Sequence, residues 1–143
     1  MREDTIRKMY THLSREASKL WDDWSLFFVG FNIRPFSILD ESNCAWTEFT
    51  KDLTAPERIE LNSFWAPHLT EVEMEAVLRH ELAHARAGYR ADHDESWEKA
   101  CIEFGVRPDT YIFPTHWEKM EWTIYLKDEL PRLAISLPRA SLL

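Results

Sequence analysis

Apolar residues recur at intervals of three and four positions near the start of the chain. This spacing is typical of an amphipathic helix that buries one stripe of its surface. We expect the N-cap at Asp4 or Thr5, because short polar side chains there accept hydrogen bonds from the first unpaired amides of a helix. The stripe consists of Ile6, Met9, Tyr10, Leu13, Ala17, Leu20, Trp21 and Trp24.

Between residues 31 and 63 the pattern changes to short stretches that are rich in aromatic and branched residues, separated by polar connectors. Such stretches are typical of β-strands joined by turns. We predict three antiparallel strands, in the segments FNIRPFSIL, CAWTEFT and RIELNSF. If the last of these is an edge strand, it could hold an extended peptide by main-chain pairing.

A second helix is predicted between Thr70 and Gly88. Thr70 and Glu73 have the spacing of a capping box, in which the two residues satisfy each other's free amides at a helix start. Gly88 is the type of residue that ends a helix.

A shorter helix is predicted from about Glu95 to Phe104, because Gly105 follows as a stop signal. The remaining residues, 109–143, combine the helix-like stretch THWEKMEWTIYLKDEL with a tail interrupted by proline. We expect a C-terminal helical extension and tail there. The order of these elements predicts an α+β fold.

Length and composition favour a single folded domain over residues 1–143. The chain has 143 residues, of which 45% are hydrophobic, and it contains only three glycines. No apolar run is long enough to cross a membrane, and the first residues lack a secretory signal, so we expect a cytoplasmic protein. Cys44 and Cys101 form no CxxC pair, and we expect both to be small buried residues.

The negative charge is concentrated in the middle of the chain. The net charge is −8, and residues 31–104 hold seven basic against fifteen acidic side chains. An electrostatic field of this sign repels phosphate backbones, so direct binding of nucleic acid is not expected.

His80, Glu81 and His84 form the motif H-E-x-x-H inside the second predicted helix. Residues four apart lie on one helix face, so both imidazoles can point at one ion. Zinc prefers neutral imidazole and keeps an open position for a water in catalytic sites. Glu81 could take the proton of such a water. The motif therefore predicts one Zn²⁺ per chain, with Glu81 as the general base.

A catalytic zinc site needs a third protein ligand, for which we favour His93, nine residues after His84. Gly88 lets the chain turn back between the two histidines. Glu98 and Glu103 are alternatives, because a glutamate on a following helix also completes zinc sites.

The developing oxyanion of acyl transfer needs a hydrogen-bond donor. The sequence singles out no one residue for this role, and four candidates remain open: Arg86, Tyr89, Tyr111 and His116.

The segment LRHELAHARAGYRADHDESWEKACIEFGVRP, preceded by RIELNSFW, resembles the SprT-like zinc metallopeptidase family, particularly its small bacterial and phage-borne members. The likeness covers about residues 29–108. The resemblance implies a zincin-like minimal domain in which a helix and a small antiparallel sheet precede the H-E-x-x-H helix. It also implies zinc ligation by His80, His84 and His93, catalysis by Glu81, and packing of Trp97 under the site.

The chain departs from this family in three respects. Asp94 stands where the third histidine is often followed by glycine. A cysteine-rich zinc ribbon and a basic DNA-binding module, which some relatives carry, are both missing from this sequence.

These observations predict a zinc-dependent metallopeptidase that acts on a protein or peptide substrate through a metal-activated water. The alternative is a zinc-stabilised, catalytically silent protein-interaction domain. Retention of Glu81 favours the enzyme, because a purely structural zinc site gains nothing from a carboxylate beside its first ligand.

Overall fold

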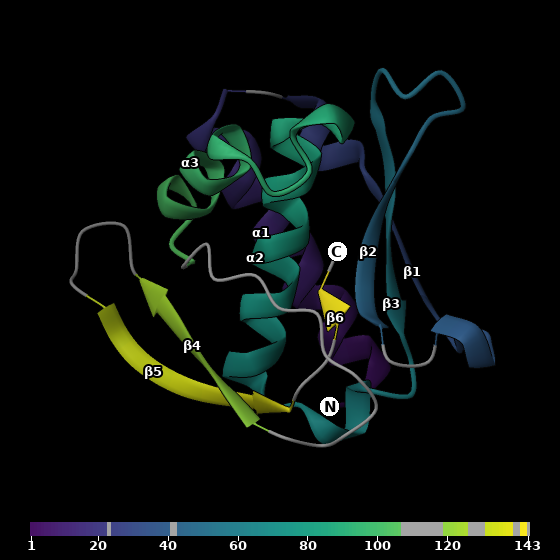
Figure 1. The fold of residues 1–143 in the computed structure, drawn as a ribbon, viewed down its shortest axis with the longest axis vertical. Helices are drawn as coiled ribbons and strands as arrows, with labels where there is room; N and C mark the ends of the chain where they lie inside the picture. The colour runs from purple at the N-terminus through teal and green to yellow at the C-terminus, as the bar shows by residue number, and fades with distance from the viewer. Residues whose placement is uncertain (23, 41–42, 107–118, 126–130, 139–140, 143) are drawn as a thin grey trace.

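The computed structural model describes residues 1–22, 24–40, 43–106, 119–125, 131–138 and 141–142. Within these residues the fold is α+β, as predicted, with helices α1 and α2 on one side of a small sheet (Figure 1). The helices are α1 (Glu3–Leu20), α2 (Glu71–Ala87) and α3 (Glu95–Glu103), and the strands are β1 (Gly30–Arg34), β2 (Asn43–Phe49), β3 (Pro56–Asn62), β4 (Lys119–Tyr125), β5 (Pro131–Pro138) and β6 (Ser141–Leu142).

The main sheet is mixed, and this corrects the prediction of an antiparallel sheet. β3 lies between β1 and β2, parallel to β1 and antiparallel to β2. β1 and β2 do not form a hairpin because Pro35 ends β1, and the chain then leaves the sheet through the 3-10 turn Ile38–Asp40. The hairpin forms instead between β2 and β3, where the amide of Thr50 donates to the carbonyl of Ala55 at 2.9 Å.

The prediction of RIELNSF as an edge strand is wrong, because β3 is paired on both sides. The outer strands of the sheet are β1 and β6, and β2 lies between β3 and β6. Its first residues pair with β6, as Asn43 with Ser141 and Ala45 with Leu142.

Asn62, at the end of β3, holds the neighbouring chain segments together. Its buried side chain accepts hydrogen bonds from the amides of Phe36 and Phe64, at 3.3 and 3.1 Å, and donates to the carbonyl of Asn43 at 3.0 Å. One amide group thus connects the ends of all three central strands.

α1 begins at Glu3, with Arg2 as an N-cap that makes no side-chain capping bond, so the prediction of Asp4 or Thr5 is wrong. Asp4 lies instead in the first turn, where a carboxylate favours the positive end of the helix dipole. Four residues of the predicted apolar stripe are buried, at spacings of three or four positions: Ile6, Tyr10, Leu13 and Ala17.

α2 has the ends that the sequence predicts. The Thr70 hydroxyl accepts from the Glu73 amide at 3.2 Å, and the Glu73 carboxylate accepts from the Thr70 amide at 2.9 Å, so the capping box is complete. At the other end, Gly88 has a φ of 97°, and its amide donates to the carbonyl of His84. The bounds of α3 also agree with the prediction. Gly105, with a φ of 80°, lies just after this helix.

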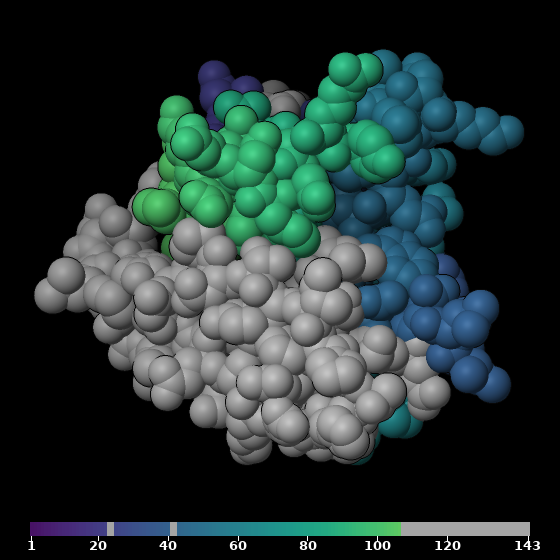
Figure 2. Space-filling view, viewed as in Figure 1, coloured from purple at the N-terminus to yellow at the C-terminus, as the bar shows by residue number. Residues whose placement is uncertain are grey.

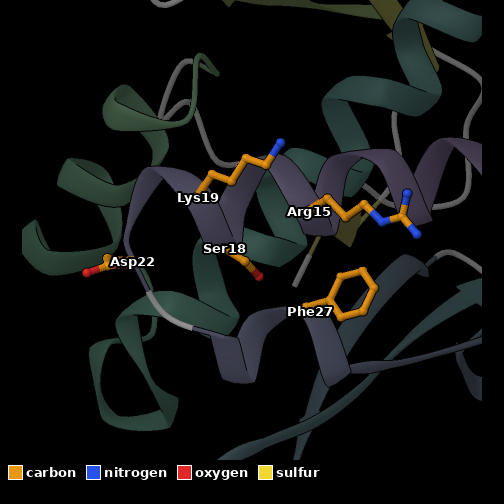
Figure 3. A pocket seen from close by; sticks show the side chains of 5 residues that line it. All are labelled: Arg15, Ser18, Lys19, Asp22 and Phe27. Carbon is orange, nitrogen blue, oxygen red and sulfur yellow. The ribbon is translucent and has the colours of Figure 1, made fainter.

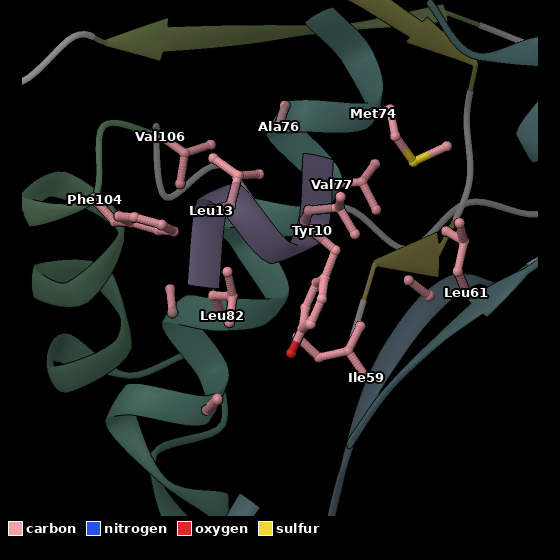
Figure 4. Packing of buried hydrophobic residues seen from close by; sticks show 14 of the residues in the cluster. Tyr10, Leu13, Ile59, Leu61, Met74, Ala76, Val77, Leu82, Phe104 and Val106 are labelled. Atoms are coloured by element: carbon pink, nitrogen blue, oxygen red, sulfur yellow. The ribbon is translucent and has the colours of Figure 1, made fainter. Parts of the chain in front are cut away.

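The hydrophobic core lies where α1, α2, α3 and β3 meet (Figure 4). Tyr10 and Leu13 of α1 approach Val77 and Leu82 of α2, while Ile59 approaches from the sheet. The core therefore extends to α1, beyond the span 29–108 of the family resemblance. Both cysteines are free and buried, as predicted.

Within the predicted C-terminal extension, the described residues form strands instead of a helix. β4 and β5 pair as an antiparallel hairpin. The sequence KMEWTIY alternates between apolar and polar residues, which is the period of a strand, and its helix-favouring glutamate and lysine obscured this pattern. Residues 109–118, 126–130, 139–140 and 143 lie outside the described part.

None of the described helices is long and apolar enough to cross a membrane.

Candidate metal centre

The structure brings His80, His84 and His93 together, so these three side chains could hold one metal ion. The Nε2 atom of His84 lies 3.2 Å from Nε2 of His80 and 3.1 Å from Nε2 of His93. His80 and His84 come from adjacent turns of α2, and both are buried. His93 approaches from the loop between α2 and α3.

The two distances from Nε2 of His84 fit a tetrahedral metal site. Three nitrogens at 2.0–2.1 Å from one zinc ion would lie about 3.3 Å from each other. The observed separations of 3.1 and 3.2 Å are close to this value. All three nitrogens belong to imidazoles, which zinc prefers, and the set leaves a fourth position free for water.

Burial favours the neutral form of the histidines, which is the form that binds metal. It lowers the pKa of His84 to about 3, and it holds the pKa of His80 well below its usual range, with smaller contributions from the neighbouring histidines. The pKa of His93 is also lowered by burial, although the carboxylate of Asp92 opposes this shift.

A β-turn over residues 91–94 directs His93 towards α2. The amide of Asp94 donates to the carbonyl of Ala91 at 2.8 Å, which closes the turn. The Asp94 carboxylate then accepts hydrogen bonds from the amides of Ser96 and Trp97, at 2.8 and 3.3 Å, and caps the start of α3. Asp94, the departure from the family pattern, is therefore an N-cap residue here.

Trp97 forms the floor of the histidine cluster. Its fully buried ring stacks on His84 with a centroid separation of 5.2 Å and meets His80 and His93 edge-on at 4.9 and 4.6 Å. This contact with all three rings agrees with the packing role that the resemblance implies. The indole thus packs against the rings of all three histidines and limits the space in which they can rotate.

Glu81 is fully buried beside the histidines, and its Oε2 atom lies 3.9 Å from Nε2 of His80. Thr47 on β2 places its hydroxyl 2.9 Å from Oε1 of Glu81 and 2.9 Å from the Glu81 carbonyl. Oε2 has no hydrogen-bond partner among the described residues. Burial raises the pKa of Glu81 well above its usual range, and the hydrogen bond from Thr47 opposes that shift.

A cleft with a volume of about 510 Å³ opens beside His84. Its aromatic wall is the edge-to-face pair of Phe49 and Tyr89, with ring centroids 5.7 Å apart. In Figure 2 the green residues around the end of α2 lie directly against the blue residues of the sheet. The cleft is lined by Trp46, Thr47, Phe49, His84, Gly88, Tyr89, Arg90 and Asp92.

The other predicted candidates lie apart from the cluster or outside the described residues. Glu98 and Glu103, the alternative third ligands, are not part of the metal-binding group, and Glu103 accepts a hydrogen bond from the Trp21 indole at 3.3 Å. Arg86 packs over the ring of Trp21 and does not line the cleft. Tyr89 does line it. Tyr111 and His116 lie outside the described residues.

Two residues of the site were not predicted. Thr47 reaches Glu81 from a strand that is 34 positions earlier in the chain, and no local pattern indicates such a contact. Asp92 directly precedes the predicted ligand His93 within a turn. This adjacency in the sequence was the one signal that could have indicated a contact between the two residues.

A second cavity, of about 230 Å³, lies between α1 and the 3-10 turn Trp24–Phe28 (Figure 3). The side chains of Arg15, Ser18, Lys19, Asp22 and Phe27 line it. It contains none of the predicted site residues.

No protein-family model matches the chain, and no curated protein or solved structure matches it.

Proposed function

We propose that this protein is a zinc-dependent metallopeptidase that hydrolyses peptide bonds, with the organisation of a SprT-like enzyme. The observation that carries the proposal is the convergence of the Nε2 atoms of His80, His84 and His93 beside the buried carboxylate of Glu81. A structural zinc site requires the ligands but not the carboxylate. The combination supports hydrolysis.

Bound zinc would lower the pKa of a coordinated water to about 7 and polarise the peptide carbonyl. Glu81 accepts the proton of the attacking water and returns it to the nitrogen of the leaving amine. Oε2 is the oxygen suited to this transfer, since it has no hydrogen-bond partner among the described residues, whereas Oε1 is held by Thr47. The raised pKa of Glu81 favours acceptance of the proton.

The substrate we propose is an extended peptide in the cleft beside His84. The cleft runs along residues 46–49 of β2, beyond the part of that strand that pairs with β6. Main-chain groups of a strand segment with a free side can pair with a peptide, which binds it with little dependence on sequence. Phe49 and Tyr89 offer an apolar wall for one substrate side chain.

Elemental analysis and peptide hydrolysis on the same samples test the proposal. Wild type and Glu81→Gln should each bind one zinc per chain, whereas His84→Ala should bind none. Glu81→Gln should hydrolyse a peptide library at least about 100-fold more slowly than wild type, because it cannot accept a proton. His12→Ala, which removes an exposed histidine of α1, is the matched control and should behave as wild type.

Absence of zinc from the wild type would overturn the proposal, as would full activity of Glu81→Gln. Binding of zinc without hydrolysis of any peptide would favour the zinc-stabilised interaction domain.

A further inference from the structure

Asp92 has a backbone conformation that its residue type rarely adopts. Its φ is 47° and its ψ is −114°, and it occupies the second position of the turn over residues 91–94. These angles are close to those of the second residue of a type II′ turn, a position that glycine dominates because a Cβ atom is crowded there. A non-glycine residue in such a conformation destabilises the fold, and strain of this kind gathers at functional sites.

The conformation gives Asp92 two contacts with the histidine cluster. The backbone of Asp92 faces the ring of His84 and acts to raise the pKa of that histidine against the effect of burial, as a hydrogen-bond acceptor does. The Oδ1 atom of Asp92 lies 3.4 Å from Nδ1 of His93. The contact at Nδ1 leaves Nε2 of His93 free, and this atom lies 3.1 Å from Nε2 of His84.

We propose that Asp92 is a positioning residue, which aligns His84 and His93 for a metal ion through its backbone and its carboxylate, respectively. The inference rests on the metal site of the proposed function. Hydrogen bonding at Nδ1 fixes the tautomer in which Nε2 carries the free lone pair, and it limits rotation of the ring.

A substitution of Asp92 can remove its side-chain contact with His93, but it keeps its backbone contact with His84. Every residue type retains the backbone group that faces His84, whereas only the carboxylate reaches His93. The Asp92 side chain is 86% exposed, so solvent screens its charge, and we expect the effect of its removal near the lower end of the range for such outer contacts. Strain and alignment can therefore be separated by the choice of replacement.

Three substitutions make this separation. Asp92→Ala removes the carboxylate and keeps the crowded Cβ atom, Asp92→Gly removes both, and Asp92→Asn keeps an oxygen that can accept a hydrogen bond from Nδ1 of His93. Zinc dissociation constants, from competition with a chromophoric chelator, should be about 10-fold higher than wild type for the alanine and glycine variants. Asparagine should restore binding to within about three-fold.

The unfolding temperature of the metal-free proteins gives the second readout. Asp92→Gly should unfold about 2–8 °C above Asp92→Ala, because glycine adopts the turn conformation without crowding. The glycine variant would thus be the more stable of the two and yet bind zinc no better than alanine. A residue with a purely structural role would not separate the two measurements.

Glu95→Gln is the control for charge, because it removes an exposed carboxylate from the first turn of α3. It should leave zinc affinity unchanged. The inference is overturned if Asp92→Ala and Asp92→Gly bind zinc as tightly as wild type, or if Glu95→Gln weakens binding as much as they do. Wild type that binds zinc but cleaves no peptide would contradict the proposed function alone, whereas wild type that binds no zinc would overturn both.

Discussion

A single hydroxyl group connects the sheet to the glutamate of the candidate site. Thr47 lies 2.9 Å from Oε1 of Glu81, so the carboxyl group is held at one oxygen and open at the other. A general base must be oriented as well as present, because proton transfer depends on distance and alignment.

Thr47→Val should lower kcat for peptide hydrolysis by about 10-fold or more and leave KM and zinc content unchanged, because valine keeps the shape of the side chain without the hydrogen bond. Thr47→Ser retains the hydroxyl and should recover most of the rate. Steady-state kinetics with a fluorogenic peptide measure both. A valine variant with the kcat of wild type, or a serine variant alone with a reduced kcat, would contradict the role of the hydroxyl.

A single side chain also stabilises the sheet, because Asn62 forms hydrogen bonds with three chain segments. Asn62→Ala should lower the free energy of unfolding by about 2–4 kcal/mol, because it leaves the amides of Phe36 and Phe64 and the carbonyl of Asn43 without this partner. Urea unfolding followed by tryptophan fluorescence measures the loss. Asn32→Ala, on the adjacent strand β1 and partly exposed, is the control and should change the free energy by less than about 1 kcal/mol.

At the scale of elements, α2 carries two of the three candidate ligands, His80 and His84, and its capping box fixes where the helix starts. The register of the helix then places His80 and His84 on the face that meets the turn and α3. A weaker start would let the first turn fray without moving the ligands, which lie two and three turns further on.

Thr70→Ala should therefore lower the free energy of unfolding by about 1 kcal/mol and leave the zinc dissociation constant unchanged. Chemical denaturation and chelator competition on the same preparation report the two quantities. Thr5→Ala, at an exposed position within α1, serves for comparison and should shift stability by less than about 0.5 kcal/mol. A large loss of zinc affinity in Thr70→Ala would contradict the independence of the two ends of α2.

The helices were more predictable than the sheet for a physical reason. Thr70, Glu73 and Gly88 act within one turn of the helix ends that they define, so their spacing alone indicates the outcome. Strand pairing depends on which distant segment lies alongside. The alternation in a strand indicates that it is half-buried, but not that β3 would lie between β1 and β2.

At the scale of the molecule, the histidines and the glutamate of the site change the stability of the metal-free protein in opposite directions as the pH falls. In the metal-free protein, burial lowers the pKa values of His80 and His84, so the unfolded chain binds more protons below about pH 6.5 and stability falls with acidification. Burial raises the pKa of Glu81, so the folded state binds the extra proton above about pH 4.5, and stability rises as pH falls towards that value.

The stability of metal-free Glu81→Gln should therefore fall between pH 7 and 5 by about 1 kcal/mol per pH unit for each buried histidine. Metal-free wild type should show a shallower fall, because Glu81 contributes with the opposite sign. Urea titrations at three pH values in the presence of a chelator measure the slope. Adding His84→Ala to the glutamine variant should reduce the slope. A stability that does not change over this interval would contradict the burial of the neutral histidines.

The candidate site was predictable in its ligands and not in its surroundings. His80, His84 and His93 were identified because helical spacing and a glycine stop are sequence-local features. The contact of Thr47 with Glu81 and the pairing of Phe49 with Tyr89 arise only when the sheet lies against α2. The turn conformation of Asp92 was not predictable because no glycine marks it. Local sequence therefore indicates which atoms could bind the metal, and tertiary packing determines the cleft beside them.

All three histidines fall within fourteen consecutive residues, whereas the hydroxyl that orients Glu81 comes from a separate part of the chain. Closing so short a loop loses little entropy, so an incompletely folded chain can already gather the three imidazoles around an ion. For the proposed zinc site, we therefore expect the metal to bind before the sheet docks during folding. An unfolded ensemble that binds zinc would reduce the stabilisation that the ion gives to the native state.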